Sequence, residues 1–255
     1  MLGAIIGDIA GSRFEFNNTK SAQFDLFAPG CSFTDDTICT VAIADAILNG
    51  RGYKESVMNW CRKYPRPMGG YGGSFAAWVQ SDDPKPYYSF GNGSAMRVSP
   101  VGWLFYDDMN VEVEAARTAE ITHNHPEGIR GAQVVALCVF MLRNGFPKEH
   151  VERFANREYG VLPEYRPFSN PFDETCMNAV PIAISCFLSS TDFEDAIRKS
   201  IIVGGDSDTI GAITGSLAEA HYGIPAEMRA RAMSYLPKDM TRIVEQFYRC
   251  VNGTK

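Results

Sequence analysis

Apolar residues recur at helical spacing along most of this 255-residue chain, whereas the alternation typical of half-buried strands is rare. Residues that start and end helices bound several of these segments: Pro126 opens one of them and Gly145 closes it. The pattern predicts helices over residues 37–48, 125–144, 173–188, 208–222, 225–235 and 238–251. We therefore expect an all-α protein.

Glycines recur at every fourth position of the N-terminal segment, as Gly3, Gly7 and Gly11. In a helix this spacing places all three on one face, where a neighbouring backbone can approach closely. The stripe predicts tight packing in a crowded core.

The chain shows no sign of a division into domains. It has no charge run, low-complexity stretch or repeat of roughly 30–50 residues, and the proline-rich segments 64–67 and 163–171 are typical of loops. We expect residues 1–255 to form one domain.

Composition and charge argue against several classes of protein. The net charge of −6 gives no general attraction to nucleic acid or an anionic membrane. The longest apolar run, 134–142, is too short for the roughly 18 residues needed to span a bilayer, and the N-terminus lacks the features of a secretory signal. The seven scattered cysteines are typical of buried free thiols in a reducing compartment. We expect a cytoplasmic monomer with no nucleic-acid or membrane partner.

Two acidic clusters carry the candidate chemistry. Asp35 and Asp36 precede one predicted helix and are flanked by threonines, and Asp206 and Asp208 stand at the start of another. Mg²⁺ and Mn²⁺ prefer oxygen ligands of this kind, and four carboxylates would repel one another unless divalent cations lay between them. Helix capping is the alternative explanation for either cluster alone. Together the clusters predict one shared centre with two metal ions.

Two glycine-rich loops, 68–75 and 87–97, add a possible phosphate site. Glycines allow backbone N–H groups to point at an anion, and a helix beginning near Ser94 would add its positive end. Aromatic residues among the glycines offer stacking surfaces for a base. Structural turns between helices are the alternative, because glycine-rich turns are common.

Taken together, these motifs resemble the ADP-ribosylglycohydrolase family over nearly the whole chain. The elements that carry the resemblance are Gly7-Asp8 with Gly11 and Glu15, then 33–37, 91–97, Thr122-His123 and 204–209. The resemblance implies a compact orthogonal helical bundle with a central site for two Mg²⁺ or Mn²⁺ ions. It also implies removal of ADP-ribose from a modified acceptor, either a protein or a small conjugate.

The resemblance also assigns residues to roles. The implied metal ligands are Thr34, Asp35, Asp36, Asp206, Asp208 and Thr209. The implied contacts to ADP-ribose are Gly72, Ser89, Phe90, Gly91, Asn92, Gly93 and His123. Glu15, Asp35 and Asp36 are the candidate catalytic carboxylates. The phosphates would be held by backbone donors and helix ends, without an Arg or Lys clamp. Outside the resemblance, Glu15, Phe90 and His123 have ordinary structural explanations: a solvated charge, core packing and a hydrogen-bonded histidine.

The acceptor linkage is left open by the sequence. The loop 68–73 contains no carboxylate that could pair with an arginine guanidinium, and its Gly-Tyr-Gly element is similar to the branch acting on O-linked ADP-ribose. We therefore favour an O-linked, serine-type conjugate slightly over an arginine-linked one. Two other functions are alternatives: a metal-dependent phosphohydrolase, although the chain has only four histidines, and a catalytically silent relative, although all six implied ligands are present.

Overall fold

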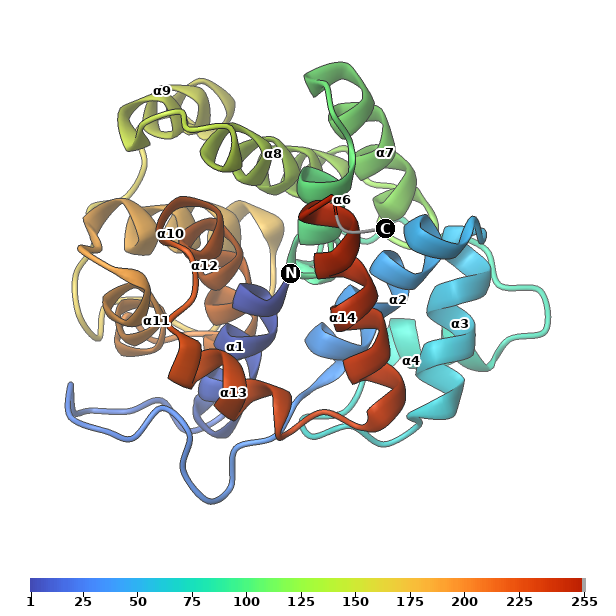
Figure 1. The fold of residues 1–255 in the computed structure, drawn as a ribbon, viewed down its shortest axis with the longest axis horizontal. Helices are drawn as coiled ribbons and strands as arrows, with labels where there is room; N and C mark the ends of the chain where they lie inside the picture. The colour runs from blue at the N-terminus through green and yellow to red at the C-terminus, as the bar shows by residue number, and fades with distance from the viewer. Residues whose placement is uncertain (254–255) are drawn as a thin grey trace.

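The computed structural model describes residues 1–253, and every named secondary-structure element in this range is a helix (Figure 1). The all-α prediction is confirmed: within residues 1–253, pairing of the β type is limited to two isolated bridges, Thr34 with Met68 and Gly91 with Thr175. The helices are α1 (Leu2–Gly11), the short 3-10 helix η1 (Ser12–Phe14), α2 (Asp35–Asn49), α3 (Tyr53–Lys63), α4 (Gly73–Gln80), α5 (Gly93–Met96), α6 (Ser99–Leu104), α7 (Asp108–Glu120), α8 (Pro126–Arg143), α9 (Lys148–Tyr159), α10 (Cys176–Ser189), α11 (Phe193–Ile202), α12 (Ser207–Tyr222), α13 (Ala226–Met233) and α14 (Lys238–Val251).

The centre of the bundle is the close pairing of α1 with α12, which lie side by side in Figure 1. A Cβ atom added at Gly7 would overlap the backbone of Gly211, and one added at Gly3 would overlap that of Gly215. Every residue of α1 is buried. The predicted glycine stripe is therefore confirmed as a site of backbone-to-backbone packing, where any side chain would force the two helices apart.

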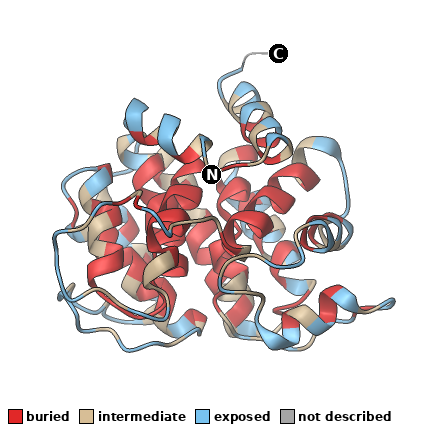
Figure 2. Cartoon of the chain, turned by 90° about the horizontal axis from the view of Figure 1, so that it is seen from below, coloured by how far each residue is buried: buried red, intermediate tan, exposed pale blue. Residues whose placement is uncertain are grey.

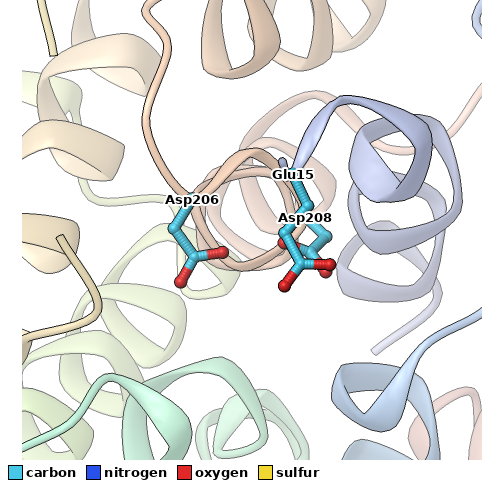
Figure 3. A group of neighbouring side chains, drawn as sticks. All are labelled: Glu15, Asp206 and Asp208. Carbon is cyan, nitrogen blue, oxygen red and sulfur yellow. The ribbon is translucent and has the colours of Figure 1, made fainter. Parts of the chain in front are cut away.

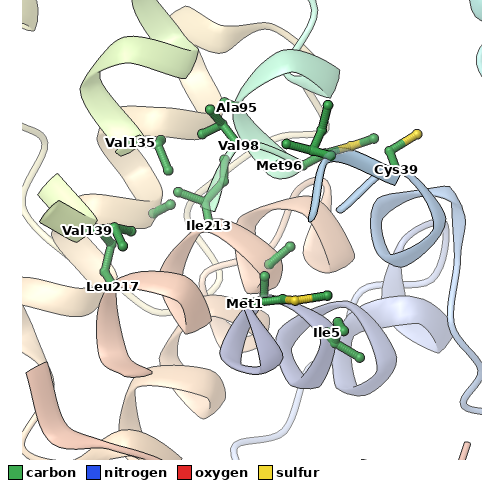
Figure 4. Packing of buried hydrophobic residues seen from close by; sticks show 14 of the residues in the cluster. Met1, Ile5, Cys39, Ala95, Met96, Val98, Val135, Val139, Ile213 and Leu217 are labelled. Carbon is green, nitrogen blue, oxygen red and sulfur yellow. The ribbon is translucent and has the colours of Figure 1, made fainter. Parts of the chain in front are cut away.

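The remaining helices pack around this pair and bury a continuous apolar core (Figure 2). Ile213 and Leu217 of α12 lie near Val135 and Val139 of α8, and Met1 and Ile5 extend the same cluster along α1 (Figure 4). Burial of this apolar surface is the main force that holds the helices together. It also fixes the relative position of the two helix starts that carry the acidic clusters.

Local capping explains where α2 and α10 begin. The Thr34 hydroxyl accepts a hydrogen bond from the Asp36 N–H at 3.2 Å, so α2 starts at Asp35 rather than at residue 37. Gly50 ends α2 with a φ of 63°, which favours glycine. The segment predicted to be helical from residue 173 starts at Cys176, because Thr175 caps it.

The cysteine prediction is correct in part. All seven cysteines are free thiols, but Cys250 is exposed on the last turn of α14 and Cys31 is only partly buried. Within residues 1–253, no helix has the length and apolar character needed to cross a membrane.

Candidate metal centre and substrate cleft

Three segments of the chain bring carboxylates to one place. Glu15 follows η1, and Asp35 and Asp36 form the first turn of α2. Asp206 and Asp208 lie at the start of α12. Carboxylate oxygens of Glu15, Asp206 and Asp208 lie within 4.8 Å of one another (Figure 3). One cation could therefore contact all three.

A hydrogen bond joins the two acidic clusters directly. The Thr209 hydroxyl donates to Asp36 Oδ1 at 3.3 Å, although the two residues are far apart in the sequence. Asp206 is held from another side, because the Asn92 side-chain amide donates to its Oδ2 at 2.7 Å. Thr34 lies directly before the cluster, where its hydroxyl donates to Asp8 at 2.8 Å and caps α2.

Helix capping does not account for this arrangement. Asp206 occupies the N-cap position of α12, but its side chain makes no capping hydrogen bond. At α2 the capping is done by Thr34, and Asp36 Oδ2 is buried without any hydrogen-bond partner. A buried carboxylate oxygen is stable only when something compensates its charge. The donor set therefore fits a hard divalent cation, which prefers carboxylate and hydroxyl oxygens.

The electrostatics of the cluster lead to the same conclusion. Burial raises the pKa values of Asp35, Asp36 and Asp208 well above the usual range, and repulsion from neighbouring carboxylates raises them further. Burial, together with the nearby Asp206 and Asp8, raises the pKa of Glu15 to about 7. These shifts mean that the cluster cannot hold its full negative charge without positive counter-charge.

A cleft of about 650 Å³ opens beside the carboxylates, which is a suitable size for a small-molecule ligand. Loop 69–73 forms one part of its wall, and loop 87–93 forms another. It brings most of the residues implied by the resemblance to one surface: Glu15, Asp35, Asp36, Gly72, Ser89, Phe90, Gly91, Asn92, Gly93, His123, Asp206, Asp208 and Thr209. Thr34 is not part of this lining.

Comparison with known proteins gives the same family as the motifs. The ADP-ribosylglycohydrolase family model matches residues 1–254. The chain belongs to this family. Its members are ADP-ribosyl hydrolases, so the phosphohydrolase alternative is set aside.

Similar proteins cover most of the chain. The ADP-ribosylhydrolase ARH3 of Homo sapiens is 26% identical and the alignment covers 88% of this chain and 84% of the relative. The ADP-ribosylarginine hydrolase Tri1 of Pseudomonas putida is 24% identical, covering 88% and 70%. A solved structure described as an ADP-ribosylglycohydrolase-related protein complex superimposes with a TM-score of 0.75 at 24% identity, covering 98% of this chain and 95% of that one. The likeness confirms the fold.

In this glycohydrolase, the loop 87–93 differs from the predicted phosphate cradle. The Gly91 N–H donates to Ser89 Oγ at 3.1 Å, and the Asn92 N–H donates to the Glu174 carbonyl at 2.7 Å. The helix that follows is a single turn, Gly93–Met96. The prediction that these backbone groups point at an anion is therefore wrong for Gly91 and Asn92, because the antiparallel bridge to Thr175 uses this part of the loop.

Loop 69–73, unlike loop 87–93, has free space beside most of its glycines. Side chains added at Gly70, Gly72 or Gly73 would meet no atom within 4 Å. At Gly69, by contrast, an added Cβ would lie 2.6 Å from Glu15 Oε2. Gly69 also has a φ of 76°, which disfavours other residues. This glycine lets the loop lie directly against the candidate catalytic carboxylate.

His123 is the end of a buried hydrogen-bonded chain. Arg97 is fully buried and donates to Thr118 O at 2.8 Å and to Thr122 Oγ1 at 2.9 Å. The Thr122 hydroxyl in turn lies 2.7 Å from His123 Nδ1 and shares a hydrogen bond with it. Burial, and secondarily Arg97, lowers the pKa of His123 well below its usual range. His123 and Arg97 both line the cleft. The absence of an Arg or Lys clamp on the phosphates stays a prediction, because Arg97 is fully buried and donates to Thr118 and Thr122.

Sequence reasoning assigned no role to Asp8, which fixes the α2 cluster. Asp8 is completely buried in α1 and accepts hydrogen bonds from the N–H and hydroxyl groups of both Thr34 and Thr37. These four donors hold the turn that carries Asp35 and Asp36. In the sequence, the sign of such a role was that Asp8 is a carboxylate within an otherwise apolar helical segment.

Asn18 performs a similar task on the other side of the site. Its amide donates to Phe14 O, Gly205 O and Ser207 Oγ, at 2.7, 2.8 and 3.0 Å. Its carbonyl oxygen accepts the Gly205 N–H at 2.9 Å. Asn18 thereby ties the segment that carries Glu15 to the turn that carries Asp206. Nothing in the sequence indicates this role, because Asn18 lies in a polar loop.

Proposed function

We propose that the acidic centre holds two divalent cations, Mg²⁺ or Mn²⁺, and that the adjoining cleft holds the ADP-ribose part of a conjugate whose glycosidic bond is hydrolysed. The observation that carries the proposal is the meeting of Glu15, the α2 carboxylates and the α12 carboxylates at one wall of the cleft. The residues that would hold the ions are Thr34, Asp35, Asp36, Asp206, Asp208 and Thr209. When bound, the ions would supply Lewis-acid chemistry that orients ribose hydroxyls and activates water.

The residues of the chain divide the remaining chemical tasks. Cleavage at ribose C1 builds positive charge on the sugar ring, so a carboxylate must exchange a proton and others must stabilise that charge. Glu15 is half-buried and lies against Gly69 on one side and the α12 carboxylates on the other, so it can reach a bond held between them. Asp35 and Asp36 are the alternative proton carriers.

The far parts of ADP-ribose would be held by groups outside the acidic centre. Phe90 lines the cleft with 44% of its surface exposed, and its ring meets His125 edge-on at 5.4 Å. An exposed ring that is fixed from one side is a suitable stacking surface for adenine. Ser89, Gly72 and the His123 imidazole offer polar contacts to the sugar and the diphosphate.

For the acceptor we propose an O-linked, serine-type conjugate, because loop 69–73 provides no carboxylate beside Glu15. The second candidate is an arginine-linked conjugate. It is favoured by Glu174, an exposed carboxylate that lines the cleft and could pair with a guanidinium. The relative in Pseudomonas putida is named an ADP-ribosylarginine hydrolase.

The seven free thiols support a cytoplasmic location, and we propose that the protein acts there as a monomer. Its partner would be an ADP-ribosylated protein or a small ADP-ribose conjugate. The carboxylates that line the cleft make a nucleic-acid partner unfavourable.

Release of ADP-ribose from conjugates of defined linkage tests the proposal. The protein would be incubated with serine-linked, arginine-linked and O-acetylated ADP-ribose, each with Mg²⁺, Mn²⁺ or EDTA, and the free ADP-ribose would be quantified by chromatography. We expect release that requires the metal and is fastest with an O-linked conjugate. Faster cleavage of the arginine-linked conjugate would select the second candidate, and the absence of release from every conjugate would contradict the function.

A further inference from the structure

Two phenylalanines from distant parts of the chain meet at the edge of the cleft and remain exposed. The rings of Phe16 and Phe172 have centroids 5.8 Å apart and are tilted by 37°. Phe16 is 71% exposed and Phe172 is 46% exposed. Large apolar side chains that pack on one another in water, rather than in the core, are typical of surfaces that contact another molecule.

The pair of Phe16 and Phe172 lies next to the acidic end of the cleft. Phe16 directly follows Glu15 and itself lines the cleft. Phe172 lies two residues before Glu174, which lines the same cleft. The pair is therefore continuous with the end of the cleft that holds the catalytic carboxylates. The other exposed rings of the cleft region, Tyr88 and Phe90, belong to a separate cluster, because both pack against His125.

We propose that Phe16 and Phe172 form a platform for the polypeptide that carries the ADP-ribose. This inference rests on the proposed function and deepens it. If the cleft holds ADP-ribose and the scissile bond lies at Glu15, the acceptor chain must leave the cleft past the residue that follows Glu15. Aromatic rings are enriched at peptide contacts because they bury a large area with little loss of side-chain freedom.

The charge around the platform favours a polypeptide over a nucleic acid as its occupant. Glu15, Asp173 and Glu174 adjoin the two rings, so a polyanion such as RNA would be repelled. A peptide with apolar or basic residues beside its modified residue would meet complementary surfaces. The platform thus explains how the enzyme would distinguish a modified protein from a small conjugate with the same linkage.

The test compares two substrates that share one linkage. One is an ADP-ribosylated peptide, and the other is the same modified amino acid without flanking residues. For Phe16→Ala, Phe172→Ala and the double variant, we expect kcat/KM on the peptide to fall about tenfold through a higher KM. For Phe172→Ala, whose ring does not line the cleft, we expect kcat/KM on the small conjugate and the affinity for free ADP-ribose to stay within about twofold of the parent.

Two exposed aromatic residues outside the cleft serve as matched controls. Tyr106 is 80% exposed and Phe146 is 41% exposed, and neither lines the cleft. Tyr106→Ala and Phe146→Ala should leave both substrates unaffected. Melting temperatures would be measured for all variants, and Phe16→Leu and Phe172→Leu would replace any alanine variant that does not fold.

The outcomes separate the platform from the proposed function. Equal losses on the peptide and the small conjugate for Phe172→Ala would overturn the platform, and so would an unchanged KM for the peptide. If the parent released ADP-ribose from no conjugate, the proposed function would fail. The platform would then be judged by calorimetry with the modified peptide, where tighter binding by the parent than by the double variant supports it and equal binding overturns it.

Discussion

Asp36 and Thr209, 173 positions apart in the sequence, are joined by a hydrogen bond of 3.3 Å between the threonine hydroxyl and the carboxylate. The contact lies where the first turn of α2 meets the first turn of α12. Helix N-termini carry partial positive charge, which stabilises nearby carboxylates to a limited extent. It does not remove the need for a cation, because Asp36 Oδ2 remains buried without a partner.

The first prediction concerns the metal centre. Two divalent ions should bind to the parent, and saturation at about 100 times Kd should add about 2.7 kcal/mol per ion to the free energy of unfolding. EDTA should abolish activity and lower the melting temperature. Asp208→Ala should lose at least one ion, measured by elemental analysis and calorimetry, because its carboxylate is one of the three that surround a common point.

Asp82→Asn is the matched control, because Asp82 is an exposed carboxylate in the loop after α4. It should keep both ions and the response to EDTA. An Asp208→Ala protein that binds two ions with parental affinity would remove Asp208 from the ligand set.

A second prediction tests the packing that holds the two helix starts together. Gly7→Ala should lower the free energy of unfolding by about 1–3 kcal/mol or more, because the new methyl group would overlap the Gly211 backbone and neither helix can move without disturbing the core. Gly73→Ala, where the added methyl group would meet nothing within 4 Å, should change stability little. Chemical denaturation measures both. Equal stability of the two variants would contradict the close approach of α1 and α12.

The helices that sequence patterns predicted include those that are apolar along most of their length, such as α2 and α12, which bury most of their residues. The pattern missed α3 and α9, which are mostly polar and bury only one narrow face. It also missed α7, whose buried residues Val111, Ala115 and Ala119 recur at helical spacing but are small. In such segments the helix is stabilised by contacts with neighbouring helices, which local sequence does not record.

Sequence reasoning could identify only those site residues whose side-chain type indicates a function by itself. Carboxylates beside hydroxyls suggest a cation whatever their surroundings, so the α2 and α12 clusters could be singled out. Asp8 and Asn18 act through hydrogen bonds to residues 26 and 187 positions away, and such partners are known only from the fold. The same holds for Arg97, whose burial beneath His123 depends on how α5 packs.

A third prediction tests Phe90 as the stacking surface for adenine. Phe90→Ala should weaken the binding of ADP-ribose by about 1–3 kcal/mol in the presence of metal, the range found for stacking of a base on an aromatic ring. Ribose 5-phosphate, which lacks the base, should bind the parent and the variant equally. Calorimetry would compare them, with Phe146→Ala as the control. Parental affinity for ADP-ribose in Phe90→Ala would show that Phe90 serves packing instead.

A fourth prediction follows from the lowered pKa of His123. The unfolded chain takes up a proton at this histidine below about pH 6.5, whereas the folded protein does not. The contribution of His123 to stability is therefore complete above that pH and is lost as the pH falls, by up to about 1.4 kcal/mol per pH unit. The free energy of unfolding should thus fall more steeply between pH 7 and pH 5 for the parent than for His123→Asn. Parallel curves would indicate that the pKa of His123 is the same in the folded and unfolded states.

The last prediction separates a catalytic role of Glu15 from a structural one. Glu15→Gln keeps the size of the side chain and most of its hydrogen bonds but removes the charge and the exchangeable proton. If Glu15 carries the proton at ribose C1, turnover should fall by about 10²–10⁴ while the affinity for ADP-ribose and the melting temperature change little. Single-turnover assays should use whichever linkage the parent cleaves faster. Glu120→Gln, an exposed carboxylate at the end of α7, should keep parental turnover. Parental turnover in a well-folded Glu15→Gln protein would move the proton-carrying role to Asp35 or Asp36.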